Sequence, residues 1–520
     1  MNFESLDLFV FVGYVLLMMG FGIWISRRKQ SDDDVEDYFL AGKTLPWWAV
    51  GASLIASNIS AEQFIGMSGS GYVVGLAIAS YEFMAAATLI VVAKFFLPVF
   101  IKKGIYTMPQ FLEERFDVRV KSGLAVFWVL LFVFVNITSV LYLGGLALNT
   151  ITGVNLVYAV IGLAIYAATF SIFGGLKAVV WTDVIQVVVL LFGGLLTTYL
   201  VLDAFSLGEG FFNGLSKLYK TAPEKFDLIL DKSNPEYINL PGISVLIGGM
   251  WIANLYYWGT NQYIVQRALA AKDIKEAQKG VAFAAFMKVL LPLVVVIPGI
   301  VAFALHADLT KPDQAYPWLL SNYVTVGFKG LAVAALVAAI GSSLSSMVNS
   351  TSTIFTLDIY KPIVQKTSKN IDLVKVGKIT SAIALVIGVI VAPLLGNLDQ
   401  AFQFIQEYTG FISPGVMAIF IFGLFWKRTT TSAALTVVLL AIPLSAALKY
   451  CCGDIPFIDR MGISFIALSI ILIIISLLDK GTEDNSSHEL EKGIFRTDSF
   501  FNIFSILIIG MLTAIYALFW

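Results

Sequence analysis

The chain has 520 residues, of which 58% are hydrophobic and only 13% are charged, and its formal net charge is −1. Soluble domains carry about 25% charged residues, so this composition excludes a soluble globular protein and indicates a polytopic membrane protein built as one helical bundle. A net charge so close to zero gives neither a basic surface for nucleic acid nor an acidic tail.

The first apolar span follows Glu4 and Asp7, where a secretory signal peptide would be basic, so we expect it to be retained as a membrane helix. In all, apolar runs long enough to cross a bilayer predict fourteen spans. These lie at 7–26, 46–70, 72–100, 122–148, 153–173, 181–204, 241–265, 279–306, 326–356, 374–396, 399–426, 431–451, 460–479 and 498–519.

Lysines and arginines concentrate in alternate loops. The loops after the first, third, fifth, seventh, ninth and eleventh spans hold most of them, including Arg27, Lys102, Arg115, Lys177, Arg267, Lys361 and Lys427. On the opposite side, lysines occur mainly in the long loop 205–240. The positive-inside rule then places both termini on the extracytoplasmic side of a plasma (bacterial inner) membrane.

Polar residues interrupt the second span. The run Ala56-Ser57-Asn58-Ile59-Ser60-Ala61-Glu62-Gln63 lies inside an otherwise apolar stretch. Polar groups at that depth are costly unless protein or a wet cavity receives them. The run therefore favours a discontinuous helix whose ends hold a solute or an ion. The alternative is a helix–helix seam of small residues, which Glu62 and Gln63 fit poorly.

A second interruption follows five spans later. The seventh span carries Asn254-Leu255-Tyr256-Tyr257-Trp258-Gly259-Thr260-Asn261-Gln262, with polar and aromatic residues on one helical face. This face either lines a solute site or forms an aromatic belt at the membrane interface. Copies separated by five spans are inverted, so spans 2–6 and 7–11 predict a LeuT-type inverted five-helix repeat. We expect one domain over 1–520, with an extra helix at 7–26, repeats over 46–204 and 241–451, and C-terminal helices over 460–519.

Several longer runs resemble motifs of the sodium:solute symporter family. They are Asp37 through Lys43, Asn58 through Gly66, Ser171 through Ala178, Trp181-Thr182-Asp183 and Gln406 through Gly410. The resemblance covers essentially the whole chain and is strongest to the family's bacterial sodium/galactose (sodium/glucose-type) members. It implies a transporter rather than an enzyme. In agreement, the sequence has no HExxH motif, and of its two histidines His306 is the last residue of a predicted span and His488 lies outside the spans.

The resemblance implies a sodium site. Its ligands are backbone oxygens at Ala56, Ile59 and Ala339 and the hydroxyls of Ser342 and Ser343. Neutral oxygens suit a hard monovalent cation, and the ends of half-helices expose carbonyls. Without the resemblance, the run from Gly341 to Ser346 is typical of a packing seam. Asp183 either lies on the ion path, as the resemblance implies, or caps the sixth span.

The resemblance also implies a sugar site. Its polar residues are Gln63, Glu82, Asn254, Lys288 and Gln406, with Tyr257 as an inner gate, Trp258 behind it, and Met67, Tyr81 and Phe402 as an outer gate. Donors and acceptors of mixed sign suit a neutral polyol with one apolar ring face. Glu82 and Lys288 each lie inside a span, where an unpaired charge is costly. They form a structural ion pair, contact the sugar, or do both.

These observations predict a secondary active symporter that couples inward sodium flux to uptake of a hexose, galactose or glucose, by alternating access. One departure bears on the sugar: Ala85 stands where the galactose-transporting members have a serine. A sodium symporter of another solute, such as myo-inositol or sialic acid, is therefore an alternative. A membrane solute sensor that does not transport is an alternative of a different class. The expected partners are the sugar, sodium and membrane lipid, with a homo-oligomer possible and no nucleic acid.

Overall fold

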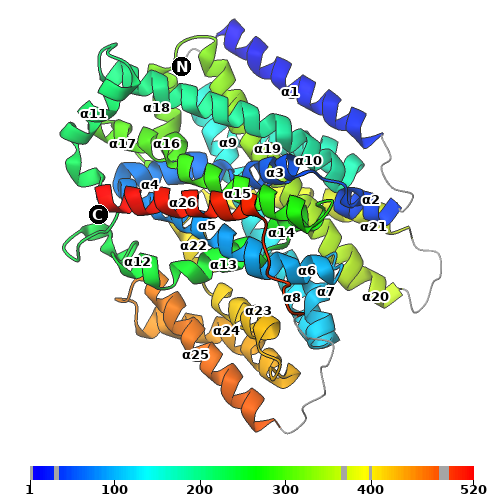
Figure 1. Ribbon diagram of the computed structural model, residues 1–520. Helices are drawn as coiled ribbons and strands as arrows, with labels where there is room; N and C mark the ends of the chain where they lie inside the picture. The colour runs from blue at the N-terminus through cyan, green and yellow to red at the C-terminus, as the bar shows by residue number, and fades with distance from the viewer. Residues whose placement is uncertain (1–3, 28–33, 365–371, 397–400, 480–490) are drawn as a thin grey trace.

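The computed structural model describes residues 4–27, 34–364, 372–396, 401–479 and 491–520, with the side chains of 34 and 401–404 left out. Within these residues the protein is built of helices joined by turns, without a β-strand. Figure 1 shows most of the long helices running roughly alongside one another as a single bundle, with α24 and α25 on its lower edge. The predicted all-helical membrane protein is confirmed at this level.

The described residues of the first half of the chain form eleven α-helices. They are α1 Ser5–Ser26, α2 Asp34–Leu40, α3 Trp47–Asn58, α4 Ser68–Val73, α5 Ser80–Val91, α6 Leu97–Lys102, α7 Met108–Arg115, α8 Val118–Leu131, α9 Thr138–Thr152, α10 Leu156–Phe205 and α11 Phe211–Thr221. Short π-helical turns continue three of these segments, namely η2 Glu62–Met67, η4 Val92–Phe96 and η5 Phe132–Ile137.

The second half, over the ranges that the structure describes, forms fifteen α-helices. They are α12 Ser244–Ile247, α13 Met250–Thr260, α14 Gln262–Leu269, α15 Ile274–Leu290, α16 Pro292–Val295, α17 Ile297–Ala304, α18 Ala315–Tyr323, α19 Phe328–Ile354, α20 Lys361–Val364, α21 Leu373–Val391, α22 Ala401–Thr409, α23 Ser413–Phe425, α24 Thr431–Cys451, α25 Phe457–Leu478 and α26 Ser499–Leu518. The π-helical turn η9 Phe355–Tyr360 joins α19 to α20.

Ten helical segments in the described part of the chain are long and apolar enough to cross a membrane. The fourteen predicted spans cover the same stretches of the chain. The number of long helices is lower than the number of predicted spans for a physical reason. The second, seventh and eleventh predicted spans are each interrupted, as α3–α4, α12–α14 and α22–α23, so none is one long helix. The fifth and sixth predicted spans are joined in the single segment α10.

The predicted interruptions of the second and seventh spans are present. Helix α3 ends at Asn58, and Ile59 is extended, with φ −75° and ψ 102°. Likewise α13 ends at Thr260, and Asn261 is extended, with φ −78° and ψ 121°. Each break frees backbone groups that a continuous helix would satisfy internally, so both segments expose hydrogen-bonding groups inside the bundle.

Helix α10 bends sharply where a loop between two spans was predicted. Gly175 has φ 54° and ψ −154°, outside the helical region. A residue at positive φ favours glycine because a Cβ would be strained there. A Cβ at this position would also collide with the backbone oxygen of Tyr38. The bend therefore requires glycine and lets α2 pack closely against α10.

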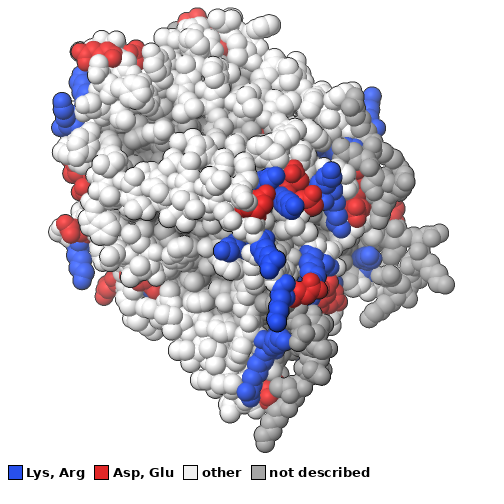
Figure 2. Space-filling view, in the orientation of Figure 1, with Lys and Arg blue, Asp and Glu red and all other residues white. Residues whose placement is uncertain are grey.

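Charged side chains gather at the two ends of the bundle. Figure 2 shows them at the left edge and in the right-hand part of the face that is in view, with a white band of uncharged residues between them. In Figure 1 the C-terminus lies at the left end, which also holds α11 and α12, and α1 begins at the top of the view. Not every predicted loop charge is at the surface, however. Arg115, Lys177 and Arg267 are buried, with exposed fractions of 1%, 3% and 0%.

The N-terminal helix is tied to α19 by a buried carboxylate. Helix α19 begins after Gly327, which has no side chain to cap it. Asp7 of α1 is fully buried, and its Oδ1 accepts hydrogen bonds from the backbone N–H of Gly327 at 2.7 Å and of Gly330 at 2.9 Å. A carboxylate at a helix N-terminus satisfies free donors and complements the helix dipole.

We expect Asp7→Ala to lower the free energy of unfolding by about 1–2 kcal/mol, because two backbone donors at the start of α19 lose their acceptor. Thermal unfolding of the purified protein in detergent measures this loss as a lower midpoint. Asp7→Asn, which keeps an acceptor oxygen, is the matched control and should lose less. A midpoint for Asp7→Ala equal to that of the wild type would contradict this capping role.

Candidate solute and ion site

A cavity opens between the helices of the bundle, with about 740 Å³ of free space that includes open solvent. All seven residues predicted to bind the solute line it: Gln63, Glu82, Asn254, Tyr257, Trp258, Lys288 and Gln406. They come from η2, α5, α13, α15 and α22, so segments far apart in sequence converge on one space. Ala85, the departure from the galactose pattern, also lines it.

Glu82 and Lys288 form a buried ion pair in the cavity wall. Their side chains are 4% and 1% exposed. Lys288 Nζ donates to the Glu82 carboxylate and to Asn58 Oδ1, and it lies 5.2 Å from the centre of the Trp258 ring. Burying an ion pair is costly unless additional hydrogen bonds complete its coordination, as Asn58 does here. Both predicted alternatives are thus compatible with the geometry, since the pair is structural and also lines the cavity.

Tyr257 connects the two helix interruptions. Its hydroxyl accepts from Asn58 Nδ2 at 2.9 Å and from the Tyr263 hydroxyl at 2.8 Å. Its ring meets that of Trp258 edge-on, with centres 5.1 Å apart. Sequence reasoning gave Asn58 no role, although Asn58 lies in the polar run that marked the break. The signal available in the sequence was an amide side chain within that polar run.

The predicted outer gate is only partly present around this cavity. Tyr81 lines it. Met67 is fully buried within η2 and does not line the cavity. The side chain of Phe402 lies outside the described residues.

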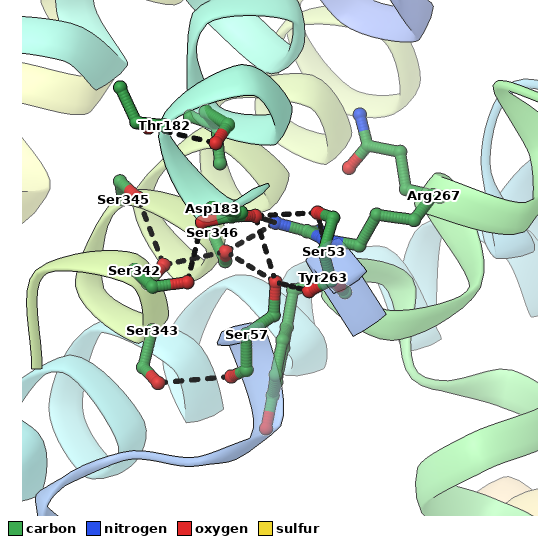
Figure 3. A network of polar contacts seen from close by, with 12 residues as sticks. Ser53, Ser57, Thr182, Asp183, Tyr263, Arg267, Ser342, Ser343, Ser345 and Ser346 are labelled. Atoms are coloured by element: carbon green, nitrogen blue, oxygen red, sulfur yellow. Dashed lines mark hydrogen bonds and ion pairs between the residues drawn. The ribbon is translucent and has the colours of Figure 1, made fainter. Parts of the chain in front are cut away.

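Serine hydroxyls of α19 meet the broken end of α3. Ser343 Oγ donates to the backbone oxygens of Ser57 at 3.0 Å and Ile59 at 3.3 Å. Two of the residues predicted to bind sodium, Ser343 and Ile59, are therefore in direct contact. Ala56 and Ala339 are fully buried on the same two segments. Figure 3 shows Ser343 beside the end of α3, next to a larger polar network.

That network centres on Asp183. Its carboxylate accepts from Ser342 Oγ and from Ser53 Oγ, each at 2.5 Å, and lies 3.9 Å from Nη2 of Arg267. Asp183 sits inside the helical part of α10, well past the bend at Gly175, so the interpretation that it caps the sixth span is wrong. The network joins α3, α10, α14 and α19 (Figure 3).

Arg267 is the largest difference between the predicted and observed site. It was predicted to be a loop charge, but it is fully buried in α14. Its guanidinium donates to Ser53 Oγ at 3.2 Å, to Ser346 Oγ and to the backbone oxygen of Tyr263. The only available signal was its position two residues after the apolar pair Ile264 and Val265, which does not separate a buried arginine from one at a helix end.

Comparisons with known proteins are consistent with this geometry. The sequence model of the sodium:solute symporter family matches residues 38–441. The sodium/glucose cotransporter of Vibrio parahaemolyticus is 52% identical over 534 residues, which cover 99% of this chain and 98% of that protein. The sodium/myo-inositol cotransporter 2 of Homo sapiens is 34% identical over 464 residues, which cover 83% and 68%.

Two solved structures share the fold. A sodium-coupled sialic acid symporter in a substrate-bound outward-open state has a TM-score of 0.79 at 25% identity, covering 92% of this chain and 99% of its own. Mhp1, a nucleobase-cation-symport-1 family transporter, has a TM-score of 0.57 at 14% identity, covering 86% and 96%, and shows a likeness of fold alone. From the family match, the 52% identity over nearly the whole chain and the apolar helices, we conclude that this multi-pass membrane protein belongs to the sodium:solute symporter family.

Proposed function

We propose that the protein is a secondary active symporter that couples inward sodium flux to uptake of a hexose, galactose or glucose. One observation carries this proposal: the cavity unites all seven predicted solute residues beside the break in α3 that contacts the serines of α19. The name of the Vibrio relative, a sodium/glucose cotransporter, supports the choice of solute. The relatives are transporters, which supports the expectation that the protein is not an enzyme.

The cavity has the chemistry that a neutral sugar needs. Gln63 Oε1 accepts from the backbone N–H and the hydroxyl of Ser60, at 3.0 and 2.9 Å, which leaves its amide N–H groups to donate to a hydroxyl. Asn254 Nδ2 donates to the Met250 backbone oxygen at 3.1 Å, which leaves its carbonyl oxygen to accept. Gln406 completes the polar set, and the rings of Tyr257 and Trp258 offer an apolar face.

Sodium is assigned to the junction of α3 and α19. Its ligands in this proposal are the backbone oxygens of Ala56, Ile59 and Ala339 and the hydroxyls of Ser342 and Ser343. The contact of Ser343 Oγ with Ile59 O at 3.3 Å supports this set. A hydroxyl can turn its hydrogen away and present a lone pair to a cation. Asp183, bonded to Ser342, is the first anionic group beyond that site and is placed on the ion path.

Coupling follows from where the two ligands bind. Sodium ties the end of α3 to α19 and thereby orders the wall that carries Asn58 and Gln63, so the sugar binds best once the ion is present. Tyr257 closes the inner side, and Tyr81, Met67 and Phe402 are proposed for the outer side. A tenfold sodium gradient contributes about 1.4 kcal/mol and a potential of 100 mV about 2.3 kcal/mol. One ion per cycle therefore sustains roughly a 500-fold sugar gradient.

The membrane arrangement is part of the proposal. Fourteen crossings follow if each interrupted segment counts as one span and α10 as two. The repeats then cover 46–204 and 241–451 within a single domain, in the LeuT-type order, and the likeness to the two solved transporters supports that order. Both termini are assigned to the extracytoplasmic side of the plasma (bacterial inner) membrane by the positive-inside rule. A homo-oligomer is compatible with this arrangement.

Uptake of radiolabelled galactose and glucose into proteoliposomes tests the proposal. An inward sodium gradient should drive accumulation above equilibrium, and an equal potassium gradient should not. Unlabelled myo-inositol and sialic acid as competitors distinguish the alternative solutes; myo-inositol is the second candidate because of the 34% identity to a myo-inositol cotransporter. Equal uptake of hexose in sodium and in potassium would contradict sodium coupling.

A further inference from the structure

A second carboxylate in the cavity has no role in the function proposed above. Glu62 lies at the start of η2, directly before Gln63, and lines the cavity. Its Oε1 accepts a hydrogen bond from Ser139 Oγ of α9 at 2.8 Å. No lysine, arginine or histidine among the described residues forms an ion pair with it. The residue is half-buried, and among the residues that line the cavity it is one of two carboxylates.

The charges of the cavity do not balance. Apart from tyrosines, its titratable lining residues are Glu62, Glu82 and Lys288. Lys288 is already committed to Glu82 and Asn58. An ionised Glu62 therefore leaves the cavity with one uncompensated negative charge inside the membrane, where an unpaired charge is costly. A cationic group on the solute would remove that cost, whereas an anionic group would add repulsion.

We propose that Glu62 gives the cavity charge selectivity: it binds aminodeoxyhexoses through their ammonium group and rejects sugar acids. This inference rests on the proposed hexose function and extends its substrate class. The contact would be a charge-assisted hydrogen bond from ammonium to carboxylate, which is stronger than a bond between neutral groups. Sialic acid and uronic acids fit poorly, because their carboxylate would meet Glu62 while the one lysine of the cavity stays paired.

Calorimetric titration of the purified full chain in sodium tests this selectivity. The ligands are D-glucose, 2-amino-2-deoxy-D-glucose, 6-amino-6-deoxy-D-glucose and D-glucuronate, at about pH 6.5, where an amine with a pKa near 7.7–8.0 is protonated. Glu62→Gln removes the charge and keeps an acceptor for Ser139. Ser139→Ala is the matched control, since it removes the hydrogen bond and keeps the charge.

In the wild type, at least one amino sugar should bind more tightly than glucose, and glucuronate more weakly. In Glu62→Gln the ratio of amino-sugar to glucose affinity should fall about tenfold, and the ratio of glucuronate to glucose affinity should rise. Ser139→Ala should keep the wild-type ratios. Identical ratios in the wild type and Glu62→Gln would overturn the inference, and they are the result expected if a proton rather than a solute neutralises Glu62.

Sodium-driven glucose accumulation, measured on the same preparation, separates the two claims. If hexose accumulates but Glu62→Gln leaves the affinity ratios unchanged, only the charge selectivity fails. If no hexose accumulates or binds, the proposed function fails. The dissociation constant of the amino sugar, in the wild type against Glu62→Gln, then still decides the role of Glu62.

Discussion

Replacing Lys288 with alanine is expected to abolish sodium-driven hexose uptake and to destabilise the fold. The substitution leaves the Glu82 side chain, 4% exposed, as an unpaired charge, and it removes the donor to Asn58 Oδ1. Breaking a buried ion pair from one side costs about 3–5 kcal/mol. Because the pair also lines the cavity, we expect the initial uptake rate to fall more than about 100-fold. Uptake into proteoliposomes and chemical unfolding measure the two effects.

A double variant separates the structural role from the solute-binding role. Glu82→Gln combined with Lys288→Met removes both charges, so stability should return to near the wild-type value. Uptake should stay low, because two polar contacts to the sugar are altered. If the double variant transports hexose at the wild-type rate, the pair is structural only. Wild-type uptake in Lys288→Ala would contradict both roles.

Replacing Ser343 with alanine is expected to weaken sodium binding. The hydroxyl is the contact between α19 and the freed carbonyls of Ser57 and Ile59. Loss of one oxygen ligand in a site built from five neutral oxygens should raise the sodium concentration for half-maximal uptake at least about tenfold, equivalent to about 1.4 kcal/mol. The measurement is the initial rate of hexose uptake as a function of external sodium.

Thr351→Val provides the matched control for Ser343→Ala. Thr351 is a buried hydroxyl of the same helix, but it donates within α19, to the Met347 backbone oxygen at 2.8 Å, and it is distant from the break in α3. The sodium dependence of hexose uptake by the Thr351→Val variant should equal that of the wild type. An unchanged sodium dependence of uptake in Ser343→Ala would show that Ser343 is not a sodium ligand.

The sequence predicted the helices well where hydrophobicity alone decides them. Helix α1 at Ser5–Ser26 and α26 at Ser499–Leu518 lie within a few residues of the predicted spans. It also located the break after Asn58, because Ser, Asn, Glu and Gln at membrane depth are costly unless a break or a cavity receives them. It missed that Gly175 bends one continuous segment, because a glycine pair between two apolar runs is equally typical of a loop.

The site was predicted less completely than the fold. The polarity of Glu82 and Lys288 at membrane depth marked both residues, and the family resemblance assigned them to the solute site whose cavity they line. Arg267 was not, because whether a charge beside an apolar run is buried depends on its tertiary partner, here Asp183. The resemblance assigned Met67 to a gate, but Met67 is fully buried and does not line the cavity.

The central claim is that one cavity couples hexose movement to sodium movement. Its most direct test is the reverse of the usual assay: uptake of radiolabelled sodium into proteoliposomes driven only by an inward hexose gradient, with sodium equal on both sides. Coupling predicts that labelled sodium transiently accumulates above its external concentration and that Lys288→Ala abolishes this accumulation. Hexose entry without net sodium accumulation would show that the two movements are not coupled and would contradict symport.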